Sequence, residues 1–192
     1  MKIDGRGANP TNRSSRENQI RENANDREQP LRRLDADACI QAKHEQNCAF
    51  PFSRMPQFWD YLSKQVDNDV VKSPKMVYDE IVKGNDQLAE WFRERDDRGL
   101  SVNANEDVWQ CVTKISDYVV RKYKDRKSRK FLAGADMFVI AHAMAMGKDG
   151  VVVSPEGMRR QNALVKIPAL CLDLKVEQIN IFQMLNRMNW RP

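Results

Sequence analysis

Residues 134–153 decide the fold class of this chain: they read Gly-Ala-Asp-Met-Phe-Val-Ile-Ala-His-Ala-Met-Ala-Met-Gly-Lys-Asp-Gly-Val-Val-Val. The stretch that follows Gly134 is strongly helical in pattern and is closed by Gly147, which predicts one helix. The run Gly150–Val153 is unbroken and β-branched, the pattern of a strand buried on both faces. Short buried strands separated by helices are typical of a small α/β domain with a mostly parallel sheet.

The rest of the chain repeats this alternation of short strands and helices. Strands are expected at Leu34, at Val70–Val71 and, on a last edge, at Ile179. Ser73 and Pro74 have the pattern of an N-cap followed by a first helical turn. Further helices are expected to open at Pro56, Asn85, Asn105, Pro168 and residue 181. We therefore expect a small, mostly parallel sheet flanked by helices.

The first thirty residues differ in composition from the remainder. Their only sizeable apolar side chains are Met1, Ile3 and Ile20. Such a segment buries too little apolar surface to offset the entropy of ordering it, so residues 1–30 are expected to be a disordered polar extension. The folded domain is expected to span residues 31–192.

Composition argues against several classes of protein. No apolar run approaches the roughly 18–20 residues that a membrane span needs, and no secretory signal opens the chain. The four cysteines lack a C-x-x-C pair and are expected to be reduced thiols, which favours a cytoplasmic protein. Only two histidines occur, His44 and His142, and both are interpreted as structural or surface residues, which disfavours a zinc site.

Acidic residues occupy positions where apolar residues are expected. Glu80 shares a helical face with Val77 and Ile81, and Asp136 shares one with Val139 and Ile140, so both carboxylates are expected on inward faces. A buried carboxylate is usually paired, protonated or bound to a cation, because leaving it unpaired costs several kcal/mol.

Two further acids lie close to strands. Asp35 falls in the first strand, and Glu156 follows the strand of Val151–Val153 and Ser154. Ligands of open parallel sheets gather at the carboxyl ends of strands, so four carboxylates could converge there. An all-oxygen site suits Mg²⁺ or Mn²⁺. Each acid also has a structural interpretation: Glu80 could pair with a basic residue, and Asp136 could interact with its helix dipole.

At these residues the chain resembles a PIN-like domain, and more narrowly an uncharacterised bacterial family related to the VapC-type toxins. The similarity covers roughly residues 34–190. The matching segments are Leu34-Asp-Ala-Asp-Ala-Cys-Ile-Gln-Ala-Lys43, Met55-Pro-Gln-Phe-Trp-Asp-Tyr-Leu62, Val77-Tyr-Asp-Glu-Ile-Val-Lys-Gly84, Leu88-Ala-Glu-Trp91, Ala133-Gly-Ala-Asp-Met-Phe-Val-Ile-Ala141, Val151-Val-Val-Ser-Pro-Glu156, Lys166-Ile-Pro168 with Cys171, and Ile181-Phe-Gln-Met-Leu185.

The resemblance implies a ribonuclease in which carboxylates hold Mg²⁺ or Mn²⁺ and water attacks the RNA phosphodiester. By position, Asp35, Glu80 and Asp136 would be the catalytic and metal-binding acids, and Glu156 a fourth, more variable metal ligand. The supporting residues would be Asp37 and Ser154. Asp37 could equally be only a helix cap. Arg32 and Arg33 depart from the family pattern, because a buried first strand should be apolar, and Pro155 interrupts the last motif.

The function that follows is a metal-dependent endoribonuclease that acts as the toxin of a bacterial toxin–antitoxin pair, with RNA, an antitoxin protein and a second copy of the chain as partners. The alternative is a degenerate PIN-like domain that binds RNA or a protein without cleavage. A haloacid-dehalogenase-type phosphatase is disfavoured: Asp35-Ala-Asp37 fits its nucleophile motif, but no late acidic pair follows Ser154.

A basic run precedes the Asp136 helix, in a chain whose formal net charge is +5. It could guide RNA phosphates toward a metal site, or it could be a solvated helix end. Trp109 and Trp190 could mark a dimer or antitoxin surface. The expected RNA-binding residues are Arg121, Lys122, Lys124, Arg126, Lys127, Arg129 and Lys130.

Overall fold

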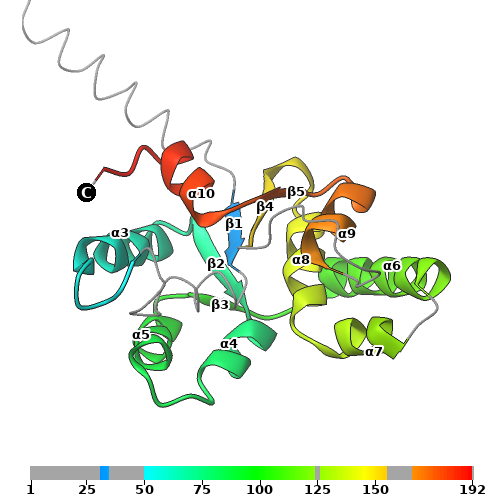
Figure 1. The fold of residues 1–192 in the computed structure, drawn as a ribbon, viewed down its shortest axis with the longest axis horizontal. Helices are drawn as coiled ribbons and strands as arrows, with labels where there is room; N and C mark the ends of the chain where they lie inside the picture. Colours follow the sequence, from blue (N-terminus) through cyan, green and yellow to red (C-terminus); the bar gives the residue numbers. More distant parts are fainter. Residues whose placement is uncertain (1–30, 35–49, 124–125, 155–165, 192) are drawn as a thin grey trace, which may run out of the picture.

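A five-stranded parallel sheet lies at the centre of the molecule (Figure 1). The computed structural model describes residues 31–34, 50–123, 126–154 and 166–191, with side chains described from residue 50 onward except at 126 and 127. The strand order is β3-β2-β1-β4-β5. The expectation of an α/β domain with a parallel sheet is confirmed. The strands are β1 (Leu31–Leu34), β2 (Val71–Pro74), β3 (Ser101–Val102), β4 (Gly150–Val153) and β5 (Glu177–Ile179).

The first strand, β1, is the central strand although it carries two arginines. It pairs in parallel with β2 on one side and with β4 on the other. Arg32 lies in register with Val71 and with Val151, between two apolar neighbours. By contrast, every residue of β4 is buried, as the β-branched run predicts.

Nine described helices surround the sheet. Of these, α8 contacts β1, β2 and β4, α6 packs on α8, and α9 contacts β5. In Figure 1, α3 and α10 lie at the upper left and α6 and α7 at the right. The helices are α3 (Pro56–Asp67), α4 (Lys75–Ile81), α5 (Gln87–Asp96), α6 (Glu106–Lys122), α7 (Arg126–Ala133), α8 (Asp136–Ala145), the short 3-10 helix η1 (Gly147–Asp149), α9 (Ile167–Leu174) and α10 (Ile181–Arg187).

Two local predictions are corrected by the structure, and one strand, β3, was not predicted. Ser73 is buried in β2, and α4 begins after Pro74 without a side-chain cap, because the backbone N–H of Ser73 donates to Leu100 of the next strand region. The cap of α5 is Asp86, whose carboxylate accepts a hydrogen bond from the N–H of Ala89, and not Asn85. The sequence of the short strand β3 contains no β-branched run that would predict a strand. It is recognised as a strand from its pairing with β2.

Helix α8 lies deep in the core. Residues 137–143 of this helix are all buried, because sheet, α6, α7 and α9 surround it. None of the helices in the described parts of the chain is long and apolar enough to cross a membrane. Residues 1–30, expected to be an extension, lie outside the described residues.

Candidate functional site

The order in which the chain adds strands to the sheet reverses at β1. From β1 the chain adds β2 and β3 on one side, and it then returns to add β4 and β5 on the other. In open parallel sheets, ligands bind beyond the carboxyl ends of the strands at such a switch point. Here that point lies beyond Leu34 and Val153, which are paired in the last register of β1 and β4.

Glu80 lies on α4, the helix that begins directly beyond the carboxyl end of β2. Its side chain is exposed, so the expectation that it lies on an inward face is wrong. The buried stripe of α4 consists of Val77, Tyr78 and Ile81. At about 100° per residue, Glu80 falls roughly 110° from the centre of that stripe. The carboxylate is therefore directed to solvent, where a ligand can reach it.

Asp136 is the first residue of α8 and is also exposed, contrary to the inward position that its periodicity predicts. The end of α8 joins the start of β4 through only Met146 and η1. The helix therefore runs back along the sheet for about 15 Å, the length of ten helical residues. This brings its first turn to the carboxyl edge, at the lower end of α8 in Figure 1.

The two helices that carry these acids contact each other. Glu80 and Asp136 thus come from neighbouring elements at the same edge of the sheet. Among the described residues, no group of three or more His, Cys, Asp or Glu side chains is close enough to hold a metal ion. Three residues of the expected site, Asp35, Asp37 and Glu156, lie outside the described residues.

Ser154 directly follows β4 and is completely buried. Its N–H donates to the carbonyl of Ile179 at 3.0 Å, and its carbonyl accepts from Nε2 of Gln178 at 3.1 Å. Both partners belong to β5, so the end of β4 is fixed to the edge strand. The backbone position of Ser154 at the switch point is therefore well defined.

The basic run is distributed over the end of α6 and over α7. Arg121, Arg129 and Lys130 are exposed, whereas Lys124 and the side chains of Arg126 and Lys127 lie outside the described parts. The ammonium of Lys122 donates to Asp173 at 2.5 Å and to the hydroxyl of Tyr118 at 3.0 Å. The hydrogen bond to Asp173 raises the pKa of Lys122. The ammonium of Lys122 is therefore already paired with a carboxylate of α9.

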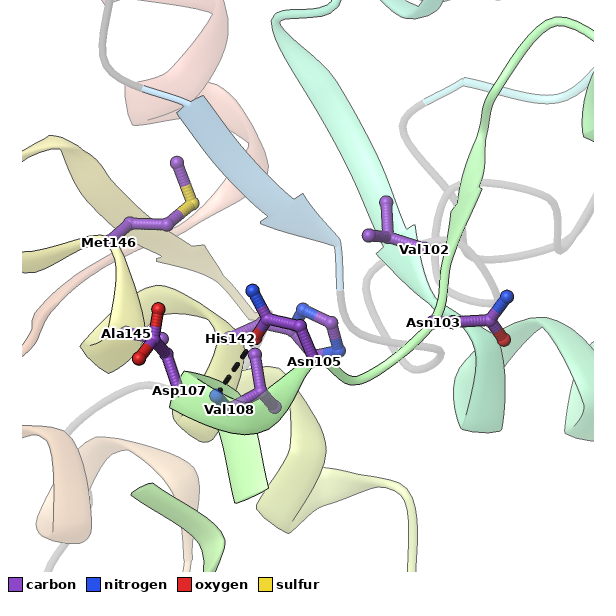
Figure 2. Close-up of a pocket in the computed structure, with 8 residues that line it drawn as sticks. All are labelled: Val102, Asn103, Asn105, Asp107, Val108, His142, Ala145 and Met146. Atoms are coloured by element: carbon purple, nitrogen blue, oxygen red, sulfur yellow. Dashed lines mark hydrogen bonds between the residues drawn. The ribbon is translucent and has the colours of Figure 1, made fainter. Parts of the chain in front are cut away.

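A small pocket of about 120 Å³ lies beyond the end of β3 (Figure 2). Its lining includes Val102 of β3, Asn105 and Asp107 at the start of α6, and His142 of α8. The side chain of His142 is 3% exposed, in keeping with its interpretation as a structural residue. Asn105 caps α6 by accepting from the N–H of Val108 at 3.0 Å, the dashed line in Figure 2. The volume accommodates a few water molecules and no nucleotide.

Comparison with known proteins adds a family and one solved structure. A family model described as "Domain of unknown function (DUF4411)" matches residues 33–192. Among curated proteins, none matches the chain. A structure described as "Crystal structure of VapBC2 from Rickettsia felis bound to a DNA fragment from their promoter" is similar at 12% identity. That match covers 78% of this chain and 98% of the other, with a TM-score of 0.45.

Proposed function

This chain belongs to the DUF4411 family, whose function is unknown, and we propose that it is a metal-dependent endoribonuclease with a PIN-like fold. One observation carries the proposal: two exposed carboxylates, Glu80 and Asp136, lie on adjoining helices at the carboxyl edge of a parallel sheet, beside its switch point. In the sequence, Asp35 directly follows the last residue of β1, and Glu156 comes two residues after Ser154.

The proposed donor set of Asp35, Glu80, Asp136 and Glu156 fits a hard divalent cation, because all four groups are carboxylates. In the proposal Asp35 and Asp136 hold Mg²⁺ or Mn²⁺, and Glu80 orients the attacking water, with Glu156 as a fourth ligand. A bound divalent cation supplies Lewis-acid activation of water and neutralises charge on the scissile phosphate. Asp37 and Ser154 are proposed to support the acids, and no protein nucleophile is required.

The placement of the cationic side chains supports a polyanionic substrate. Arg129 and Lys130 lie on α7, which immediately precedes the helix that begins at Asp136. Both are exposed, as is Arg121 at the end of α6. Exposed cations close in the chain to a metal site can hold the phosphates on either side of the one that is cleaved. Their contribution would be sequence-independent and sensitive to salt.

We further propose that the chain is a toxin, because its sequence resembles VapC-type toxins. In such a pair the ribonuclease is held inactive by an antitoxin protein, so the chain is proposed to have a protein partner as well as RNA. A second copy of the chain is a further proposed partner.

The decisive experiment is cleavage of mixed cellular RNA by the purified full chain. Wild type is incubated with Mn²⁺ or Mg²⁺, with EDTA as the control, beside an Asp35→Ala/Asp136→Ala double variant. Asp79→Ala is the matched control, because Asp79 lies next to Glu80 but forms an ion pair with Lys75 on its own helix at 3.3 Å. We expect cleavage by wild type and Asp79→Ala alone, leaving 5′-phosphate ends. Equal inactivity of wild type and the double variant would contradict the proposal.

A second candidate function is supported by β1. Arg32 and Arg33 replace the apolar residues expected in a central strand, a change that a domain without catalysis could tolerate. In that case the chain would bind RNA or a protein without cutting. Binding that persists in EDTA and is unchanged in Asp136→Ala, with no cleavage under any metal, would favour this candidate.

A further inference from the structure

Trp109 is an exposed tryptophan beside the proposed site. It lies near the start of α6 and is 52% exposed, whereas Trp59 and Trp91 are 3% and 4% exposed. Exposing a large aromatic side chain forgoes the stabilisation that its burial would give. A tryptophan left in this position is therefore available for contact with another molecule.

The orientation of Trp109 is set by Phe138 of α8. The two rings are perpendicular, at 89°, with centroids 5.4 Å apart. Phe138 is itself buried, and it follows Asp136 by two residues. A perpendicular contact of this kind occupies at most one face of the indole and keeps the ring in one orientation. Trp109 thus presents an aromatic surface at a fixed place next to the first turn of α8.

We propose that Trp109 stacks on an unpaired base of single-stranded RNA, an inference that rests on the proposed ribonuclease function. Aromatic side chains bind single-stranded nucleic acid in this way because every base has a π-face, and cationic side chains nearby hold the backbone. Both parts are present here, since α7, with its exposed Arg129 and Lys130, contacts α6 and α8.

The helix geometry indicates which nucleotide is bound. Phe138 and Asp136 are two residues apart, so their side chains leave α8 in nearly opposite directions. A base on Trp109 therefore belongs to a nucleotide flanking the one that is cleaved. Trp109 is a positioning residue, and its loss is expected to raise KM and leave kcat nearly unchanged.

The same helix offers a control that separates RNA from protein contact. Val120 is 60% exposed and lies eleven residues after Trp109, about 16 Å along the same face of α6. An interface between proteins that ran along this face would use both side chains. A single base stacked on Trp109 would not reach Val120.

The test measures binding of a fluorescent, single-stranded RNA oligonucleotide to the full chain in EDTA, so that cleavage does not interfere. Wild type is compared with Trp109→Ala, Trp109→Phe and Val120→Ala, and thermal unfolding shows that each variant is folded. We expect Trp109→Ala to weaken binding at least about fivefold, with Trp109→Phe in between and Val120→Ala close to wild type. With Mn²⁺ present, the same oligonucleotide then gives KM and kcat for each variant.

Unchanged RNA affinity in folded Trp109→Ala would overturn the inference, as would a wild type that binds no single-stranded RNA. If Trp109→Ala and Val120→Ala instead both convert a dimer to a monomer and leave RNA affinity alone, the face is a protein interface and the inference is wrong. A wild type that binds RNA through Trp109 but never cleaves it would support the stacking and contradict the nuclease. The experiment therefore distinguishes failure of the stacking proposal from failure of the ribonuclease proposal.

Discussion

The backbone carbonyl of Ala143 lies where a side chain at Gly150 would begin: a Cβ at position 150 would be 2.0 Å from that oxygen. The contact joins the last turns of α8 to the first residue of β4. It lets the helix lie directly on the strand, which in turn fixes how far α8 extends toward the carboxyl edge. The position of Asp136, at the start of α8, therefore depends on Gly150 of β4, which lies against the other end of the same helix.

Replacing that glycine should destabilise the protein. In Gly150→Ala the added methyl group can be accommodated only if the backbone of α8 or β4 moves, because the atom it meets is a carbonyl oxygen. We expect a loss of at least about 2 kcal/mol in the free energy of unfolding, measured by urea denaturation.

Gly134→Ala is the matched control for this loss. Its added Cβ would meet the nearest backbone oxygen at 3.4 Å, an ordinary contact. We expect a change within about 0.5 kcal/mol. Equal losses in the two variants would show that the close approach of α8 and β4 is not what limits position 150.

The start of α5 can be tested with two adjacent residues. Asp86→Ala removes the carboxylate that accepts from the N–H of Ala89 at 3.0 Å, so we expect a loss of about 1 kcal/mol. Asn85→Ala should have almost no effect, although the sequence alone favours Asn85 as the cap. Thermal unfolding of the two variants decides between the positions, and a larger loss in Asn85→Ala would contradict the structure.

Metal binding should be visible without any substrate. A cation held only by the folded chain stabilises it by about 2.7 kcal/mol at a concentration 100 times its Kd. For a domain of this size we expect Mn²⁺ to raise the Tm by roughly 5–10 °C at that concentration. The rise should persist in Asp79→Ala and disappear in Asp35→Ala/Asp136→Ala. A rise of the same size in the double variant would place the cation elsewhere.

The buried thiol of Cys171 predicts a loss of stability at high pH. Burial raises the pKa of Cys171 to about 12, from a usual value of 9.0. Well below pH 9 the thiol is protonated in both states, and its contribution to stability is complete. As the pH rises from 9 toward 12, the unfolded thiol ionises while the folded one keeps its proton, so the free energy of unfolding falls.

The expected slope from this one group is up to about 1.4 kcal/mol per pH unit. It is measured as the difference between wild type and Cys171→Ala in urea denaturation at a series of alkaline pH values. The variant has its own constant loss from the missing side chain, so the slopes and not the absolute values are compared. Parallel slopes would show that the thiol ionises equally in both states.

The sequence predicts this fold well where residues are buried on both sides. The valine run of β4 is an example, because all of its residues are buried. The helix expected to open at Asn105 is also found, and Asn105 caps it. Periodicity fails for Glu80 because the buried stripe of α4 includes Tyr78 and is centred about 110° away from Glu80, and it fails for Asp136 because of where that residue lies on its helix. Asp136 begins its helix, and the packing around α8 covers only the residues that follow.

The remaining differences arise from long-range pairing. Ser73 has the local signature of a helix cap, but its N–H donates to Leu100 and the residue joins β2. Nothing in the described residues tests the roles of Asp35, Asp37 and Glu156, and these stay predictions.

The central place of β1 has a consequence for synthesis of the chain. Its partner β4 lies roughly 120 residues further along, so the contact between them is among the most non-local in the molecule. Until β4 leaves the ribosome, one side of β1 is an open edge able to pair with another chain. We expect products that stop before Gly150 to aggregate or to be degraded, so that the second half of the chain protects the first.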